Sequence, residues 1–308
     1  KRETLKDLAE ITGYSITTIS RILNGKAKDS RISDKTVREI LEKLKSLHLN
    51  SNIFAQNLCI NNSYTIGLIL PFIKNPFFAS LANAIIDEAK ANDYSVMLMD
   101  TLEDANMEKT ALEKMKSKNV DGIILVPCGD DPKFLKRYSK TLPILVVDRY
   151  FKKSNLPYIS TNNFEGAYNA TKLLILSGHK DILCIQGPPI SITTKERVLG
   201  CLKAVKEIGD LNRFNIKGNQ FSIQNGYTET MLAMNRRERP TAIFALSNTI
   251  LLGAIKAINE LRLKIPDDVS LISFDNNIYL DYLNPPITRV AQPISCIGQT
   301  ALKLLIDS

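Results

Sequence analysis

From Tyr64 onward, short apolar runs rich in β-branched residues alternate with segments of helical periodicity, and this alternation restricts the fold more than any other feature. The first set of runs reads TIGLIL, VMLMD, GIILV and ILVVD, with helices beginning near Phe77, Asn106 and Asp131. A second set reads ILCIQG, TAIFALS and VSLISFD, with helices over residues 164–177, 194–209, 225–235 and 248–262. Strands that alternate with helices form parallel sheets with right-handed crossovers. The sequence therefore predicts an α/β core of two doubly wound parallel-sheet subdomains.

The N-terminal stretch has a different, all-helical pattern. A first helix is expected to be capped by Thr4 and to end at Gly13, with apolar positions at Leu5, Leu8, Ala9 and Ile11. Ser15 caps a second helix that Asn24-Gly25 closes, and its inward stripe is drawn from Ile16, Ile19, Ile22 and Leu23. A third helix follows Ser33, with its buried side at Val37, Ile40, Leu41, Leu44 and Leu47.

Three short helices with a tight glycine turn between the first two predict a helix-turn-helix unit, which sets its second helix in the DNA major groove. The side chains left outward on that helix are polar: Thr17, Thr18, Ser20 and Arg21. Such groups can reach base edges, and Arg21 can donate two hydrogen bonds to a guanine. A small bundle that docks another protein is the alternative, but docking surfaces are more apolar than this one.

The distribution of charge agrees with a DNA-binding N-terminus. The chain carries a net charge of +8, and residues 1–60 hold 11 Lys and Arg against 7 Asp and Glu. The other 248 residues hold 29 against 25, so the net positive charge per residue is about four times higher in the first fifth of the chain. The segment that forms the predicted helix-turn-helix is therefore also the most basic.

The motifs TLKDLAEITGYSITTISRILNG, RISDKT and NIFAQNL, in this order, resemble the DNA-binding head of the lactose-repressor/galactose-repressor (LacI/GalR) family, and the similarity continues to the end of the chain. The resemblance implies a homodimeric transcription regulator, most simply a repressor, that binds a near-palindromic DNA operator. It implies DNA contacts from the head at Thr4, Leu5, Ser15, Ile16, Thr17, Thr18, Ser20, Arg21 and Asn24.

The segment NIFAQNL matches the hinge helix of that family, which orders on the operator and inserts a leucine into the minor groove. By position, Leu58 is the wedge, and Asn52 and Ala55 are further DNA contacts. An apolar wedge that unstacks one base step bends the DNA and allows more contact. The family's Tyr-x-Pro before this helix is replaced here by Leu49, Asn50 and Ser51, and a plain linker is the alternative.

The predicted core should bind a ligand between its subdomains, because ligands of such sheets collect beyond the carboxyl ends of the strands. Strand-end carboxylates and guanidinium groups can bind neighbouring hydroxyls, and aromatic rings can cover the apolar side of a sugar. The resemblance implies the same effector cleft, for a sugar or sugar derivative and less readily for a purine. The residues expected in the effector cleft are Asn75, Phe77, Phe78, Asp148, Arg149, Arg197, Phe221, Ser247, Asn248 and Asp275.

These expectations divide the chain into a helix-turn-helix domain (1–47), a hinge and linker (48–63), an N-subdomain (64–160 with 291–308) and a C-subdomain (161–290). Residues 285–290 are expected to cross back into the N-subdomain as a strand, followed there by a helix over 295–306. Family members continue with a further strand pair that returns to the C-subdomain, so either the natural chain extends beyond Ser308, which we expect, or the C-subdomain lacks an edge.

Two other classes of function remain open. A sugar-binding receptor like the periplasmic binding proteins would share the core, and Asp148 with Asp275 could be written as the carboxylate pair of a glycosidase. The five scattered cysteines and two histidines form no metal or catalytic motif, so neither a metal nor a cofactor is expected. Without a signal segment or an apolar run long enough to span a membrane, the sequence predicts a cytoplasmic protein.

Overall fold

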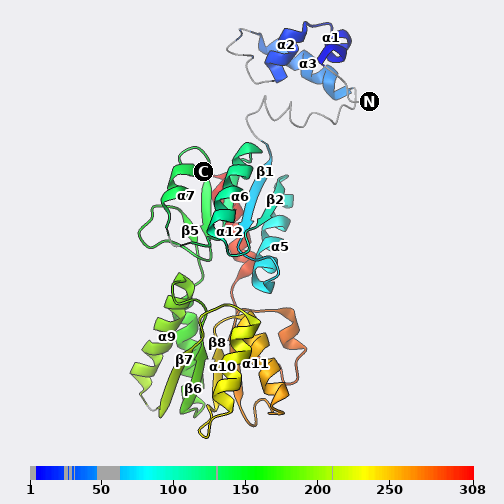
Figure 1. Cartoon of the computed structure of the whole chain (residues 1–308). Helices are drawn as coiled ribbons and strands as arrows, with labels where there is room; N and C mark the ends of the chain where they lie inside the picture. Colours follow the sequence, from blue (N-terminus) through cyan, green and yellow to red (C-terminus); the bar gives the residue numbers. More distant parts are fainter. Residues whose placement is uncertain are drawn as a thin grey trace.

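The structure is a computed structural model, and it describes residues 5–23, 27, 30, 32–46, 63–129, 131–209 and 211–308. The described residues form a helical head and two α/β lobes, which we call the N-lobe and the C-lobe (Figure 1). The predicted fold class is confirmed. None of the helices in these ranges is both long enough and apolar enough to cross a lipid bilayer.

The head consists of α1 (Leu5–Thr12), α2 (Ile16–Leu23) and α3 (Asp34–Ser46). Gly13 has a φ of +79° in the turn between α1 and α2, a conformation that glycine adopts without steric cost. Two of the three predicted hydroxyl caps are present: Ser15 Oγ accepts a hydrogen bond from Thr18 N (3.0 Å), and Ser33 Oγ accepts one from Thr36 N (3.2 Å). The third, Thr4, lies outside the described residues. Local sequence signals therefore account for where α2 and α3 begin.

Buried apolar side chains from all three helices hold the head together: Leu8, Ile19, Ile22 and Ile40. Ile11, one of the apolar positions in the pattern of α1, lies outward, with its side chain 43% exposed. Thr12 takes the inward position one turn after Leu8, and its hydroxyl donates a hydrogen bond to Leu8 O (2.7 Å). From α3, Lys43 Nζ donates a hydrogen bond to Thr12 O (3.1 Å) at the C-terminal end of α1.

The N-lobe contains a parallel sheet with the strand order β2-β1-β3-β4-β5. Its strands are β1 (Thr65–Leu70), β2 (Ser95–Asp100), β3 (Gly122–Leu125), β4 (Ile144–Val147) and β5 (Tyr158–Ile159). Helices α6 (Ala105–Ser117) and α7 (Lys133–Tyr138) cover one face of this sheet. The other face is covered by α5 (Pro76–Ala91) and by α12 (Ile294–Ile306), which comes from the far end of the chain.

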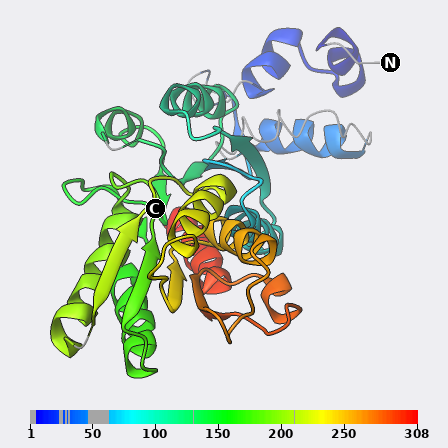
Figure 2. The same cartoon turned by 60° about the horizontal axis from the view of Figure 1, so that its bottom comes forward.

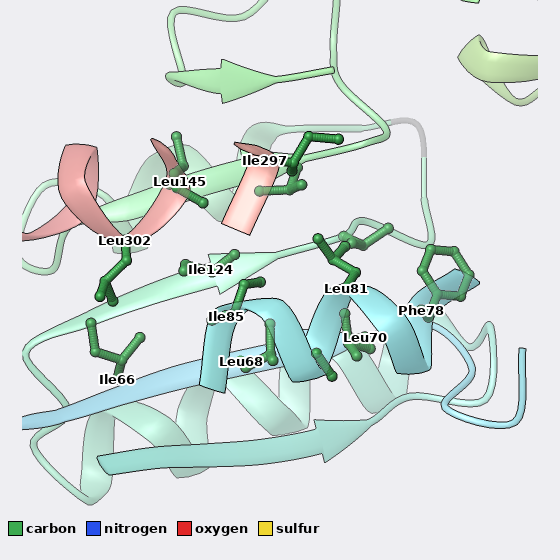
Figure 3. Packing of buried hydrophobic residues seen from close by; sticks show 14 of the residues in the cluster. Ile66, Leu68, Leu70, Phe78, Leu81, Ile85, Ile124, Leu145, Ile297 and Leu302 are labelled. Atoms are coloured by element: carbon green, nitrogen blue, oxygen red, sulfur yellow. The ribbon is translucent and has the colours of Figure 1, made fainter. Parts of the chain in front are cut away.

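Figure 3 shows how α5 and α12 pack on the N-lobe sheet. Leu81 and Ile85 of α5 and Leu302 of α12 lie against Leu68 and Ile124 of the strands, and all five are fully buried. Complete burial of a leucine or isoleucine side chain stabilises a fold by about 1.5–3 kcal/mol. This cluster therefore fixes the C-terminal helix to the lobe formed by the first α/β strands.

The C-lobe has a sheet of the same kind, with the order β10-β9-β8-β6-β7. Its strands are β6 (Asp181–Ile185), β7 (Arg213–Lys217), β8 (Ala242–Ala245), β9 (Ser270–Phe274) and β10 (Thr288–Val290). Helices α8 (Asn163–Leu176) and α9 (Ile192–Ile208) cover one face. Helices α10 (Ile223–Met234) and α11 (Asn248–Glu260) cover the other, and they lie side by side in Figures 1 and 2.

The two lobes have the same topology, and each is covered by one helix that follows the last strand of the other lobe. Read from the second strand of each lobe, both sheets follow the order second, first, third, fourth, fifth. After β5 the chain crosses at residues 160–162 to place α8 on the C-lobe, and after β10 it crosses at 291–293 to place α12 on the N-lobe. Two separate crossings therefore connect the lobes.

The predicted helices of the lobes begin within two residues of their observed starts, but one strand does not cross between the lobes as expected. Residues 285–290 were expected to form a strand that crosses into the N-subdomain, whereas β10 pairs with β9 in the C-lobe, with Arg289 opposite Ser273. The crossing follows this strand at residues 291–293, and Pro293 immediately precedes α12. The sequence also did not indicate β5, which has two residues, or β7, whose polar RFNIK run lies at a sheet edge.

The contact between α10 and α11 requires two glycines. A Cβ added to Gly253 would lie 2.0 Å from Ile223 O, and one added to Gly226 would lie 2.0 Å from Ile250 O. Alanine normally stabilises a helix interior by about 1 kcal/mol relative to glycine. We expect Gly253→Ala to lower the stability of the C-lobe instead, by about 1–3 kcal/mol, because the two helices must move apart.

Thermal and chemical denaturation would measure this effect. Asn259→Ala is the matched control, since Asn259 lies on the exposed side of the same helix and alanine there should leave stability unchanged or raise it. A Gly253→Ala variant as stable as the wild type would show that close helix contact is not needed.

Candidate effector cleft and DNA-binding face

The carboxyl ends of the strands from both lobes meet at a cleft between them. A small central space there, which we call the central cleft, is lined by Asn75, Phe77, Phe78, Asp148, Arg149, Thr193, Arg197, Phe221, Ser247, Asp275 and Gln292. The structure thus brings together every residue predicted for the effector cleft except Asn248. Asn248 is fully buried behind the lining, and neither polar atom of its side chain has a hydrogen-bond partner.

Two aspartates occupy equivalent positions in the two lobes. Asp148 follows β4 and Asp275 follows β9, and each of these strands is the fourth of its lobe. Their backbone N–H groups donate to the last residue of the fifth strand, Asp148 to Ile159 O (2.8 Å) and Asp275 to Val290 O (3.0 Å). Both have left-handed backbones, with φ of 63° and 77°. Such conformations are uncommon for residues other than glycine and are concentrated at functional sites.

Arg197 is buried in the C-lobe wall of the cleft, with 4% of its surface exposed. Its guanidinium group lies over the ring of Phe274, 3.7 Å from the centroid, and donates to Asn163 Oδ1 (2.8 Å) and to Leu246 O (2.6 Å). Its Nη2 is 3.9 Å from Asp275 Oδ1. Burial lowers the pKa of Arg197, while the charges of Asp275 and Asp148 oppose that shift. These contacts fix the guanidinium group in one orientation before any ligand binds.

A chain of hydrogen bonds links Asp275 to both crossings between the lobes. Asp275 accepts a hydrogen bond from Asn248 N (3.1 Å) and one from Gln292 Nε2 (2.6 Å). Gln292 Oε1 in turn accepts from Thr161 Oγ1 (2.6 Å). Thr161 lies in the first crossing and Gln292 in the second. The central cleft is therefore in direct contact with both segments that connect the lobes.

Asp148 differs from Asp275 in the hydrogen bonding of its carboxylate. It is 7% exposed, and no group in the described part of the chain donates a hydrogen bond to its side chain. Burial raises the pKa of Asp148 from 3.8 to about 6, against the opposing charges of Arg197 and Arg149. A buried acceptor without a donor is available to a ligand that carries hydroxyl or amino groups.

Arg149, beside Asp148, is held from the N-lobe. Its two Nη atoms donate to the two carboxylate oxygens of Glu103, each at 2.7 Å, and Nη1 also donates to Pro127 O (3.2 Å). Burial alone would lower the pKa of Arg149, but the hydrogen bonds and the charge of Glu103 raise it. This bidentate pair keeps Arg149 ionised at the edge of the cleft.

Most of the open space lies beside the central cleft, where sequence reasoning did not place a site. The central cleft has a volume of about 20 Å³, enough for a water molecule or two, whereas an adjoining cavity measures about 730 Å³. The two share Arg149 and Phe221. Residues of the larger cavity that were not predicted include Tyr150, Phe151, Lys152, Lys153, Ile190, Ser191 and Lys195. They follow β4 and β6, so the strand-end rule could have found them.

The head presents a polar face on α2. Ile19 and Ile22 are fully buried, whereas Ile16, Thr17 and Arg21 are exposed, with Ile16 at 46%. Ile16 is therefore an outward residue rather than part of the inward stripe, and Thr18 and Ser20 are half-buried. The Oγ atoms of Ser15 and Thr18 lie 2.8 Å apart at the start of the helix. An exposed helix of this composition can enter a major groove.

Several predicted DNA contacts cannot be located. The hinge residues Asn52, Ala55 and Leu58, together with Thr4 and Asn24, lie outside the described residues, and for Leu5 only the backbone is described. They remain predictions from the sequence.

A head with an exposed helix-turn-helix face, joined to two α/β lobes with a polar cleft between them, defines a class of DNA-binding proteins with a small-molecule domain. Residues 63–307 match the family described as "Periplasmic binding proteins and sugar binding domain of LacI family". The chain belongs to the LacI family of transcriptional regulators.

Individual relatives agree with this assignment. The chain is 32% identical to the HTH-type transcriptional repressor PurR of Mannheimia succiniciproducens, over 99% of this chain and 91% of that protein. A lac repressor dimer solved with operator and the anti-inducer ONPF is 26% identical, with a TM-score of 0.79 over 100% of this chain and 92% of that one. A LacI family regulator of Enterococcus faecium with bound ribose is 29% identical, with a TM-score of 0.71 over 79% and 89% of the two chains.

The raised pKa of Asp148 predicts a stability cost of ionisation. Because its folded pKa is about 6 and its ordinary value is 3.8, keeping it charged at pH 7.5 disfavours the folded state, and that cost is relieved as the pH falls through 6. We expect Asp148→Asn to raise the free energy of unfolding at pH 7.5 by about 1–3 kcal/mol, with little difference from the wild type near pH 4. Thermal denaturation at the two pH values measures this.

Asp93→Asn is the control, because Asp93 is exposed and has a similar left-handed backbone, with φ of 61°. Any gain from asparagine in this conformation appears in both variants. Equal effects of the two substitutions, or an Asp148→Asn effect independent of pH, would contradict the assignment of the cost to buried charge.

Proposed function

We propose that the protein is a homodimeric repressor that binds a near-palindromic operator and whose operator affinity is set by a small-molecule effector in the cleft between its lobes. The observation that carries this proposal is the face of α2, where Ile16, Thr17 and Arg21 are exposed above the buried Ile19 and Ile22. These exposed side chains can contact a thymine methyl group and base edges, and Arg21 can bind a guanine through two hydrogen bonds. A protein with this role acts in the cytoplasm, where its operator is.

A homodimer would present two heads to successive major grooves, so that the symmetry of the protein matches that of the operator. The related lac repressor was solved as a dimer on its operator. The lobes also have large apolar side chains exposed to solvent. The most exposed are Ile278 and Tyr282, at 76% and 80%, which lie at the two ends of the 3₁₀ helix η2 (Ile278–Asp281). Neighbouring exposed apolar side chains are typical of surfaces that bind a partner.

The side chains that line the central cleft suit a sugar or sugar derivative, whose bulk would occupy the adjoining cavity of about 730 Å³. Asp148 offers a free acceptor, Arg197 and Arg149 offer fixed charges, and Phe77, Phe78 and Phe221 supply rings for the apolar side of a sugar. The Enterococcus faecium relative contains ribose, which supports this class. A purine, which could also stack on these rings, is the second candidate. A thermal-shift screen with sugars, uronates and purines would distinguish them, because a ligand of the folded state raises the melting temperature.

The contacts of Asp275 suggest how the effector would act on the heads. A ligand that changes the hydrogen bonds of Asp275 or Gln292 also changes contacts in both crossings, and so favours one angle between the lobes. Only a difference in effector affinity between the two angles can shift operator binding.

Catalysis and a purely receptor role are less well supported. The relatives are transcriptional repressors and regulators, and the carboxylates of a hydrolase would have to be supplied by Asp148 and Asp275, of which Asp275 is already held by Asn248 and Gln292. A receptor without a DNA role would not need the exposed face of α2. Incubating identified ligands with excess protein and recovering them chemically unchanged would exclude turnover.

Operator recognition can be tested at Arg21. An operator selected from random DNA should bind with an affinity that falls steeply as salt rises, because phosphate contacts release counterions. We expect Arg21→Ala to weaken operator binding by about 1–3 kcal/mol and to relax specificity at one base pair of each half-site. Fluorescence anisotropy with the selected operator and its single-base variants measures both effects.

Arg237→Ala removes the same charge from an exposed position in the C-lobe and is the matched control. If the two variants weaken binding equally, Arg21 acts only through net charge. Binding that does not depend on DNA sequence or on salt would refute the proposed function.

The link between the cleft and the crossings can be tested at Thr161, which does not line the central cleft. Thr161→Val keeps the shape of the side chain but removes the hydrogen bond to Gln292. We expect effector binding to persist while the effect of effector on operator affinity changes by about 0.5–2 kcal/mol. Thr300→Val, on the exposed side of α12, should leave that effect unchanged, and an unchanged response in Thr161→Val would argue against this route.

A further inference from the structure

The cavity beside the central cleft, which we call the lateral cavity, has the size of a ligand site in its own right. Its volume of about 730 Å³ falls within the range of about 300–1,000 Å³ that is usual for small-molecule sites. It adjoins the central cleft, and Arg149 and Phe221 line both spaces. A ligand at Arg149 and the neighbouring Asp148 therefore borders this cavity.

The lining of the lateral cavity is basic. Lys152 and Lys153 enter from the N-lobe and Lys195 from α9 of the C-lobe. Among the residues that the structure describes, neither Lys153 nor Lys195 has an ion-pair partner, and Lys152 Nζ lies 3.8 Å from Glu196. Glu103, an acidic residue of the lining, already pairs with Arg149. The cavity therefore has two lysines whose charge is not neutralised by the protein.

The start of α9 adds to the positive potential. This helix has 17 residues, and Ser191 and Ile192, where it begins, line the cavity. Ser191 does not cap the helix with its side chain; its Oγ lies 2.9 Å from Thr193 Oγ1 instead. The first N–H groups of a helix are unpaired within it and attract anions, above all phosphate.

Apolar and aromatic groups complete the walls. Tyr150 and Phe151 lie on the N-lobe side, and Ile190, Leu199 and Phe221 on the C-lobe side. Tyr150 stacks on Tyr158 with ring centroids 4.2 Å apart, and its hydroxyl donates a hydrogen bond to Glu196 of the C-lobe. The anion is thus expected on a molecule with a carbon skeleton, since a site for inorganic ions alone needs no such walls.

From these features we infer that the effector is a phosphorylated small molecule, a sugar phosphate in the simplest case. Its hydroxyls lie at Asp148 and Arg149, and its phosphate lies in the lateral cavity with Lys152, Lys153, Lys195 and the start of α9. This inference rests on the proposed function, because it adds a phosphate to the effector proposed for the central cleft.

Binding of matched probe pairs to the full chain tests the inference. Calorimetry and thermal shift would compare ribose with ribose 5-phosphate and glucose with glucose 6-phosphate, with galacturonate and inorganic phosphate as further probes, at constant ionic strength. We expect at least one sugar phosphate to bind at least tenfold more tightly than its parent sugar. The variant Lys152→Gln/Lys153→Gln/Lys195→Gln should lose that advantage and keep any binding of the parent sugar.

A matched triple variant, Lys140→Gln/Lys206→Gln/Lys303→Gln, removes three exposed lysines that do not line the cavity and should behave as the wild type. The inference is overturned if no sugar phosphate binds more tightly than its parent, if none of the probes binds, or if the cavity variant binds sugar phosphates as the wild type does. Tight binding of galacturonate alone would assign a carboxylate instead and also overturns it. All these outcomes leave operator binding intact, whereas failure of the proposed function shows as loss of sequence-specific operator binding.

Discussion

The structure depends most on the contacts that converge on Asp275. Its carboxylate accepts hydrogen bonds from Asn248 N and Gln292 Nε2 and lies 3.9 Å from Arg197, which is itself fixed by Asn163, Leu246 O and the ring of Phe274. A buried charge without partners costs several kcal/mol, so these groups must remain together in the folded protein. Because Gln292 also accepts a hydrogen bond from Thr161, the same network joins the C-lobe to both crossings. The network therefore stabilises the fold and also forms part of the lining of the central cleft.

The repeated topology explains why the cleft has a carboxylate on each side. Asp148 and Asp275 both follow a fourth strand, and both backbones bend to a positive φ while their N–H groups bond to the end of a fifth strand. The crossing starts directly after that fifth strand in each lobe. The two carboxylates are therefore adjacent to the crossings, but only Asp275 accepts hydrogen bonds from the protein. That difference leaves the Asp148 carboxylate available to a ligand, while Asp275 is connected to the crossings through Gln292.

Sequence reasoning was most successful where local patterns determine structure. The buried runs ILVV and LISF predicted strands and thereby placed Asp148 and Asp275 at their ends, and Ser15 and Ser33 marked helix starts through their capping hydroxyls. It failed where distant contacts decide. Gln292 belongs to the cleft only because a crossing passes it, and β10 joins β9 through pairing that its three residues do not encode. The apolar pattern of α1 also did not indicate that Thr12 is buried, with its hydroxyl donating to Leu8 O within the helix, while Ile11 is exposed.

The lateral cavity is a second feature that sequence reasoning did not find, because contacts between distant segments form it. Attention to residues that directly follow strands found Asp148 and Arg149, but the next residues along that loop, Tyr150 to Lys153, form the wall of a much larger space. Lysines there would ordinarily be interpreted as solvated surface charge, since nothing in the sequence brings Lys153 near Lys195. The fold does so because the loop after β4 and the start of α9 come from opposite lobes at the same strand-end edge. A change in the angle between the lobes would change the separation of these charges. An anion between them would therefore bind the protein with different affinity at the two angles. Such a difference in affinity is the condition for an effector to shift operator binding.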